Sequence, residues 1–173
     1  MICACIGVPA VKDNYLAGET EVRSTLLKME IIRHITKLYS EGFDTFMCGC
    51  YPGVPLWTGE SIISLRRDFP GFENMKLYCC MPYDGFIGDL PPTFENRCRN
   101  VADKADKVIY IGDEFHPDCL RDADKYMSQI ADCVFLASFR KNFAGTMKPD
   151  QPHIFKRLVW LNAGNYVTRE CFF

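Results

Sequence analysis

The segment Gly49-Cys50-Tyr51-Pro52-Gly53, here termed the glycine turn, has residue types that suit anion binding. It follows an apolar run at residues 44–48 that predicts a strand, and it precedes a helix that begins near Pro55. Glycine lets the backbone approach a phosphate, and amides at a helix N-terminus can donate to it. The spacing matches neither a Walker A loop nor a GxGxxG fingerprint. A tight turn with a purely structural role is therefore the alternative interpretation.

Further candidate ligand contacts lie outside this turn. Gly145 and Thr146 offer a backbone amide and a hydroxyl for a second anion-binding turn, with an ordinary loop as the alternative. Tyr51 and Tyr83 can stack on a base or ribose, or else pack on a neighbouring loop. Arg121 can form a bidentate pair with a phosphate, or a surface ion pair with Asp118 or Asp122.

Catalytic candidates are weak. Asp84, Asp113 and Glu114 follow predicted strands, but no local spacing pairs them for acid–base chemistry. His34 is expected on the solvated side of the first helix. Cys50 precedes a helix, which can lower the pKa of a thiol, so a reactive cysteine is a minor alternative there.

Ten cysteines are present, mostly within or beside apolar runs: Cys3, Cys5, Cys48, Cys50, Cys79, Cys80, Cys98, Cys119, Cys133 and Cys171. Reduced cysteines that act as small hydrophobic residues are the simpler interpretation. A metal or iron–sulfur site is the alternative, but no CxxC knuckle and no nearby histidine support it, so no metal site is predicted.

Composition and charge exclude several classes of function. The chain has 173 residues, 48% of them hydrophobic, and a formal net charge of −2, which fits one globular domain over residues 1–173. Nucleic-acid binding is not expected, because the arginines and lysines at 97, 99, 104 and 107 fit a solvated helix face better than a binding patch. No apolar run approaches the ~20 residues of a membrane span, and no secretory leader is apparent. We therefore expect a cytoplasmic protein.

Short apolar runs alternate with longer helical patterns along the chain. Strands are predicted near residues 2–6, 44–48, 75–81, 108–111, 134–137 and 157–161, and helices near 21–40, 55–69, 93–105 and 117–131. Gly42 stands where the first helix needs a C-terminal cap. This alternation predicts an α/β fold, a Rossmann-like three-layer α/β/α sandwich around a mostly parallel sheet of five to six strands.

Ligands of such sheets bind outside the carboxyl ends of the strands, near the point where the strand order reverses. The residues just past each predicted strand therefore form the candidate site. They include Gly7, the glycine turn, Tyr83, the acids after residue 112 and the segment that leads to Gly145 and Thr146.

Several segments together resemble one family. They are Cys5-Ile6-Gly7, the helix at 31–38 closed by Gly42, Phe46-Met47-Cys48-Gly49 with Gly53-Val54 and Leu56-Trp57, Lys76-Leu77 leading to Met81-Pro82-Tyr83, the Ala-Asp corners at 105–106 and 131–132, Tyr126-Met127, and Gly145-Thr146. In this order they resemble the YpsA-like branch of the SLOG superfamily, relatives of the Lonely Guy proteins and of DNA-processing protein A. The resemblance covers roughly residues 2–161. It implies a Rossmann-like sheet that binds a small nucleotide-derived ligand, such as an ADP-ribose-like molecule, at its glycine turns.

The chain departs from that family where polar groups are expected. Val8-Pro9 stands in place of His-Arg, Cys50 in place of a second glycine, Pro55 in place of an acid, and Ala123-Asp124 in place of Arg-Asn. The glutamate that follows the Gly-Thr loop in phosphoribohydrolases is absent from residues 147–150. These departures argue against transfer of hydrolase activity.

A nucleotide-binding or sensing domain is the preferred interpretation. No cofactor is assigned by the residues beyond a nucleotide or ADP-ribose-like ligand. The alternatives are an N-glycosidic or phosphoribosyl hydrolase, and a degenerate domain used for protein interaction. For the last, the tail Cys171-Phe172-Phe173 could form a self-association surface in a homo-oligomer, or it could pack on its own domain.

Overall fold

Strands and helices alternate along the chain as the hydrophobic pattern predicts. In the computed structural model, residues 1–7, 22–138, 157–162 and 167–172 are described. The elements, in chain order, are β1 (Ile2–Gly7), α1 (Val22–Ser40), β2 (Thr45–Gly49), α2 (Val54–Asp68), β3 (Lys76–Tyr83), the 3₁₀ helix η3 (Phe86–Asp89), α3 (Pro92–Asp103), β4 (Lys107–Gly112), α4 (Cys119–Ile130), β5 (Cys133–Ser138), β6 (Arg157–Asn162) and β7 (Val167–Phe172). Gly42, with φ +94°, follows α1 in the left-handed conformation expected of a C-terminal glycine.

All these strands form one sheet of order β4-β3-β2-β1-β5-β6-β7. Neighbouring strands from β4 to β6 are parallel, and β7 pairs antiparallel with β6. The sheet therefore has one strand more than the five to six predicted. The additional strand is β7, which contains part of the aromatic tail. Its adjacent charged residues Arg169 and Glu170 interrupt the alternation of apolar and polar residues that predicts a strand.

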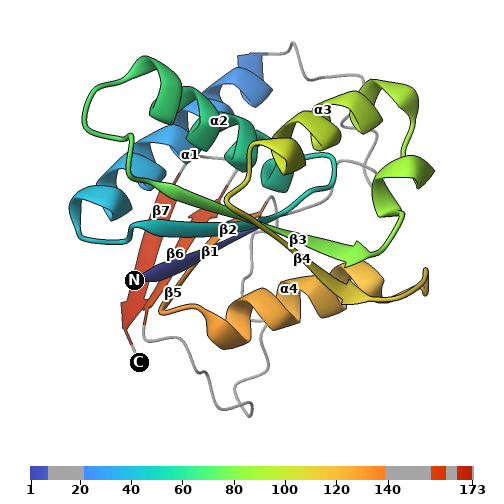
Figure 1. The fold of residues 1–173 in the computed structure, drawn as a ribbon. Coiled ribbons are helices and arrows are strands. Elements are labelled where there is room, and N and C mark those ends of the chain that lie inside the picture. Colours follow the sequence, from blue (N-terminus) through green and yellow to red (C-terminus); the bar gives the residue numbers. More distant parts are fainter. Residues whose placement is uncertain (8–21, 139–156, 163–166, 173) are drawn as a thin grey trace.

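Helices cover both faces of the sheet and complete the predicted three layers. Helices α1, α2 and α3 lie on one face, and α4 lies on the other (Figure 1). The arrangement follows from right-handed crossovers, because β1 to β4 are added in one direction and β5 returns to the opposite side of β1.

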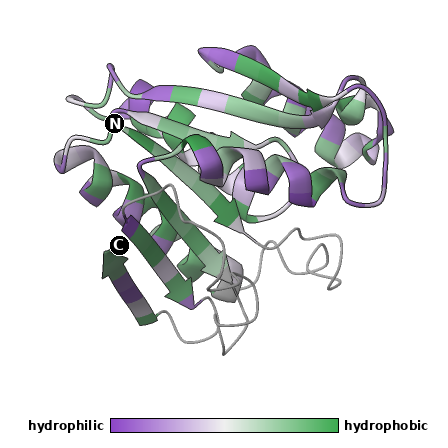
Figure 2. Cartoon of the chain, turned by 90° about the horizontal axis from the view of Figure 1, so that it is seen from below, coloured by the Kyte–Doolittle hydropathy of each residue, from purple (hydrophilic) through white to green (hydrophobic). Residues whose placement is uncertain are grey.

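Alternate strand residues enter two separate apolar clusters. Cys5, Phe46 and Cys48 pack against α1 to α3, whereas Ala4, Met47 and Val134 pack against α4. Figure 2 shows apolar strands beneath helices with mixed polarity, as expected of strands covered on both sides. The two apolar clusters pack on opposite faces of the sheet and stabilise the alignment of its strands.

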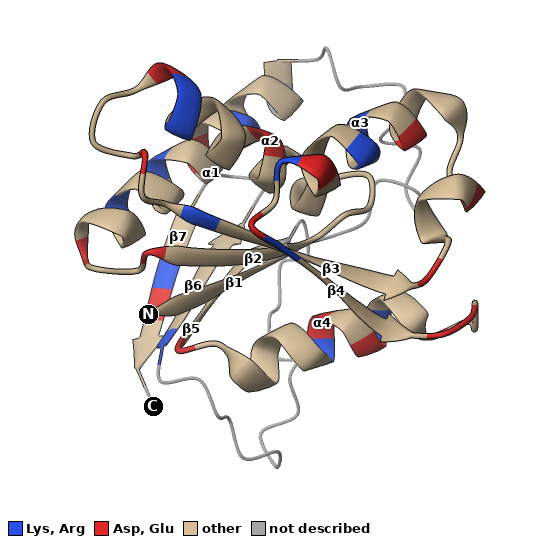
Figure 3. Cartoon of the chain, viewed as in Figure 1, with Lys and Arg blue, Asp and Glu red and all other residues tan. Residues whose placement is uncertain are grey.

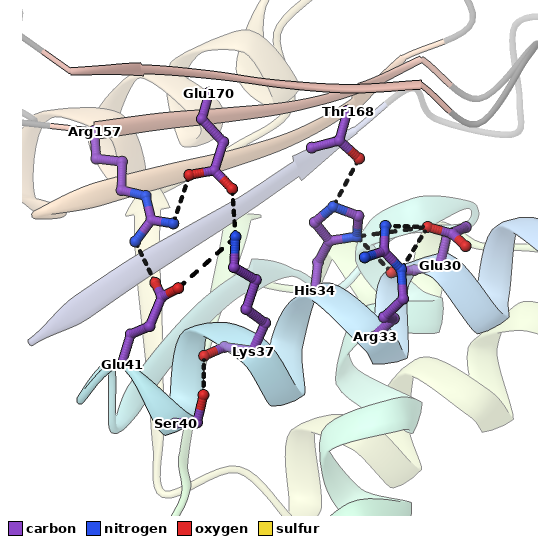
Figure 4. A network of polar contacts seen from close by, with 9 residues as sticks. All are labelled: Glu30, Arg33, His34, Lys37, Ser40, Glu41, Arg157, Thr168 and Glu170. Carbon is purple, nitrogen blue, oxygen red and sulfur yellow. Dashed lines mark hydrogen bonds and ion pairs between the residues drawn. The ribbon is translucent and has the colours of Figure 1, made fainter.

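Helix α1 is joined to the last two strands by a polar network (Figure 4). Glu170 accepts hydrogen bonds from Lys37 at 2.6 Å and from Arg157 at 2.8 Å, and Arg157 also pairs with Glu41. These contacts tie β7 to the domain, although Phe172 remains 72% exposed.

The prediction that His34 is solvated is wrong. His34 is only 2% exposed and its ring stacks on Phe135 of β5. Its ring nitrogens lie 2.7 Å from the Glu30 carbonyl and 2.9 Å from Thr168 Oγ1. The helical pattern placed His34 beside polar neighbours, but β7 covers that side of α1.

Basic and acidic residues are interspersed along the described helices and strands (Figure 3). Arg97, one of the basic residues considered above, pairs bidentately with Glu60 at 2.7 and 2.8 Å and so joins α3 to α2. Arg99 pairs with Glu95 on its own helix at 2.8 Å. Within the described residues, no helix is long and apolar enough to span a membrane.

Candidate functional site

The strand order reverses between β1 and β5, because β2, β3 and β4 lie on one side of β1 and β5 lies on the other. At a reversal of strand order, the strands that follow two adjacent parallel strands are added in opposite directions along the sheet. A crevice lies outside the carboxyl ends of the two strands, and α/β sheets bind their ligands there. Gly7 ends β1 at this point, and Ser138 ends β5. The predicted contacts Gly145 and Thr146 follow β5 but lie outside the described residues.

The glycine turn lies beside this point, at the end of β2. Gly53 has φ +110° and immediately precedes α2, so a side chain there would be strained. A Cβ at Gly7 would lie 2.4 Å from Val54 Cβ, and one at Gly49 would lie 2.0 Å from Tyr51 Cε1. Gly7 and Gly49 therefore allow the end of β1, the turn and the first residue of α2 to pack closely.

Backbone amides near the N-terminus of α2 already donate hydrogen bonds within the protein. The Leu56 amide donates to the Tyr51 carbonyl at 3.2 Å, and the Trp57 amide donates to the Gly53 carbonyl at 3.0 Å. Pro55 has no amide hydrogen. An anion would have to bind through amides of the turn itself rather than through these three helical residues.

The structure argues against the minor alternative of a reactive thiol at Cys50. Cys50 is fully buried, and its Sγ lies 3.6 Å from both Cys79 Sγ and the Cys98 carbonyl. The hydrogen bond with Cys79 and the burial hold the pKa of the Cys50 thiol well above its usual value. The expected effect of a helix N-terminus is outweighed, because the side chain points into the core.

Most of the other cysteines lie in the same core, whereas Cys80 faces α4 on the other side of the sheet. All ten are free, and all except Cys171 are buried. Cys5, Cys48 and Cys79 lie side by side in register across β1, β2 and β3. Among the described residues, no group of three or more metal-ligating side chains could hold a metal ion. The nine buried cysteines serve as small core residues, as their positions within apolar runs predict.

Tyr51 is 1% exposed, and its hydroxyl donates a 2.5 Å hydrogen bond to Asp124 Oδ1 on α4. Burial raises the pKa of Asp124 to about 7, although the hydrogen bond from Tyr51 acts in the opposite direction. Sequence reasoning did not select Asp124 as a site residue. A signal was available, because Asp124 lies four residues after Leu120 and three before Met127, inside the apolar stripe of α4.

Tyr83 is also packed. Its hydroxyl donates to Asp89 at 2.8 Å, and its ring makes edge contacts with Phe86 and Phe115. Burial and the neighbouring Asp89 raise the pKa of Tyr83 to about 12. For both tyrosines the structure thus shows the packing that was the alternative to stacking on a ligand, and contact with a ligand stays a prediction.

The acids considered for catalysis do not lie at the reversal of strand order. Asp84 follows β3, and Asp113 and Glu114 follow β4; all three are exposed. Strand β4 is three positions from β1, a separation of about 14 Å at the usual strand spacing. Arg121 is 74% exposed and pairs with Asp118 at 2.9 Å, so its predicted role in phosphate binding would require release from that pair.

The sequence comparisons agree with this architecture. The chain matches the family described as the YspA SLOG family over residues 16–154. It is 23% identical over 173 residues to UPF0398 proteins of Staphylococcus aureus strains JH9, JH1 and Mu3, an alignment that covers 90% of this chain and 86% of each relative. The matched segment runs from before α1 to just before β6 and so includes the glycine turn, the Tyr51–Asp124 pair and the residues after β5. With the parallel sheet and its reversal at β1, this match makes the chain a member of the YspA SLOG family.

Proposed function

We propose that the protein binds a nucleotide or nucleotide-sugar phosphate, such as ADP-ribose, at the carboxyl ends of β1, β2 and β5. The observation that carries the proposal is the reversal of strand order at β1, with Gly7 and the glycine turn at adjacent strand ends. Family membership and the predicted Gly145-Thr146 turn support the same ligand class.

Binding without hydrolysis is the expected activity. An N-glycosidic hydrolase needs a carboxyl group within hydrogen-bond reach of the scissile bond. The acids considered for that role follow β3 and β4, away from the reversal point. Incubation with AMP or ADP-ribose should therefore release no free base above the buffer background, as measured by chromatography.

Thermal unfolding with a ligand panel tests the proposal. A ligand at about 100 times its Kd stabilises the folded state by about 2.7 kcal/mol, which corresponds to about 5–10 °C in Tm for a chain of this size. We expect such a shift for ADP-ribose or a mononucleotide, and a smaller one in Thr146→Val. Thr36→Val, the same chemical change on α1, is the matched control. No shift with any ligand would contradict the proposal and favour a protein-interaction domain.

A further inference from the structure

The Tyr51–Asp124 pair connects the glycine turn to the helix on the other face of the sheet. The turn leads into α2, whereas Asp124 belongs to α4, so their 2.5 Å hydrogen bond crosses the carboxyl edge. The ring of Tyr51 lies directly against Gly49, since a Cβ there would be 2.0 Å from Cε1. The Tyr51 ring therefore lies between the Asp124 carboxyl and Gly49. Its hydrogen bond to Asp124 fixes the position of Tyr51 in the glycine turn.

Few other charges surround this carboxyl in the described part of the chain. From β3, Cys80 and Tyr78 face α4, and Lys107 lies beside them on β4, with its Nζ 5.9 Å from the Tyr78 ring. Burial raises the pKa of Cys80 to about 12, so that thiol is neutral. From β1 and β2, the cluster against α4 receives Ile2, Ala4, Ile6 and Met47, and none of these side chains titrates. On α4 itself, the neighbours of Asp124 along the chain include Cys119, Arg121, Asp122, Lys125 and Tyr126.

We propose that Asp124 is a positioning residue whose protonation is coupled to anion binding at the glycine turn, so that a phosphate-bearing ligand binds more tightly when this carboxyl is neutral. The inference rests on the proposed function and adds its regulation by pH. An ionised carboxylate so close to the turn repels a bound phosphate, whereas a neutral carboxyl still accepts the hydrogen bond from Tyr51 and keeps the turn in shape.

The coupling has a defined direction and range. Burial brings the pKa of Asp124 to about 7, so its charge changes between about pH 6 and pH 8. A bound anion raises that pKa further, and binding near pH 7 therefore takes up a proton. For charges about 10 Å apart in a partly buried site, the affinity should change about tenfold across this range.

Isothermal titration calorimetry with ADP-ribose from pH 5.5 to 8.5 tests the inference. The charge of this diphosphate diester does not change in that range, and two buffers of different ionisation enthalpy report the proton uptake. In the unmodified protein, Kd should rise about tenfold between pH 6 and pH 8.5. Asp124→Asn should bind with a pH-independent Kd near the value of the unmodified protein at pH 6. Asp68→Asn, the same charge change at the far end of α2, should retain the full pH dependence.

Tyr51→Phe separates coupling from a merely structural role and serves if Asp124→Asn does not fold. The phenylalanine ring can still pack on Gly49, but the hydrogen bond that lowers the pKa of Asp124 is lost. The midpoint of the Kd profile should therefore move to higher pH. A flat profile in the unmodified protein, an unchanged slope in Asp124→Asn, or an unmoved midpoint in Tyr51→Phe would overturn the coupling while ADP-ribose binding stands. If neither ADP-ribose nor any ligand of the thermal panel binds at any pH, the proposed function is overturned, and the coupling with it.

Discussion

Asp124 and His34 have shifted pKa values, and they make the stability of this fold depend on pH in opposite directions. Both are held inside contacts that join distant segments, Asp124 to the glycine turn and His34 to β7. Burial favours the neutral form of each. The neutral form of aspartic acid is the protonated one, whereas neutral histidine is deprotonated, and the two pH dependences therefore differ in sign.

Asp124 should destabilise the protein as the pH rises. Its pKa is about 7 in the folded state and 3.8 ordinarily, so the folded state binds the proton more tightly between these values. The associated stability is present below about pH 4 and is lost as the pH rises through 7. Asp124→Asn should thus be more stable than the unmodified protein at pH 8.5, by about 1–3 kcal/mol after allowance for partial solvent contact, and no more stable at pH 4.5. Urea unfolding at both pH values measures this, and equal effects at both would contradict it.

His34 should destabilise the protein as the pH falls. Burial lowers its pKa below the ordinary 6.5, so the unfolded state takes up a proton first. Stability from this residue is therefore present above pH 6.5 and declines below it. His34→Gln should flatten the loss of unfolding free energy between pH 7 and 5.5, although it weakens the packing on Phe135. An unchanged slope in His34→Gln would contradict the assignment of this pH dependence to His34.

At the scale of the element, the close approach between β1, the glycine turn and α2 depends on two glycines. The side chains of Tyr51 and Val54 occupy the space that a Cβ at Gly49 or Gly7 would need. This requirement is structural and holds with or without a ligand. The glycine spacing alone therefore predicted the turn but could not distinguish a phosphate cradle from a packing requirement.

Gly49→Ala should be destabilising because Tyr51 cannot move away without breaking its bond to Asp124. We expect a loss of about 1–3 kcal/mol in unfolding free energy, the usual cost of overpacking. Gly88→Ala is the matched control, since a Cβ there meets nothing within 4 Å. In a double-mutant cycle, Gly49→Ala should cost less in the Tyr51→Ala background. Full additivity would indicate that Tyr51 is not what excludes a side chain at position 49.

At the scale of the whole molecule, one continuous sheet between two apolar cores encloses nearly all the thiols. Ellman's reagent should therefore modify one cysteine rapidly in the folded protein, Cys171, and all ten in guanidinium. Cys171→Ser should abolish the rapid phase. Two or more rapid thiols in the folded protein would show that a cysteine described as buried becomes accessible.

Much of the architecture could be predicted from the sequence because it depends on local periodicity. The positions of β1 to β6, the four long helices, the cap at Gly42 and the burial of the cysteines all follow from patterns of a few residues. The resemblance to the YpsA-like branch identified the family for the same reason, since it depends on the order of short segments.

Only the tertiary structure could decide how segments far apart in the chain meet. Thr168 of β7 contacts His34, 134 residues earlier in the chain. Strand β7 therefore buries a residue that the polar pattern of α1 predicted to be solvated. Core packing, rather than the helix N-terminus, controls the thiol of Cys50. The pairing of Tyr51 with Asp124, 73 residues apart, depends on α4 returning beneath the sheet to reach β5. The sequence by itself therefore determined the family and which elements form. The strand order determined which side chains meet at the glycine turn, because burial and charge interactions depend on proximity in space rather than along the chain.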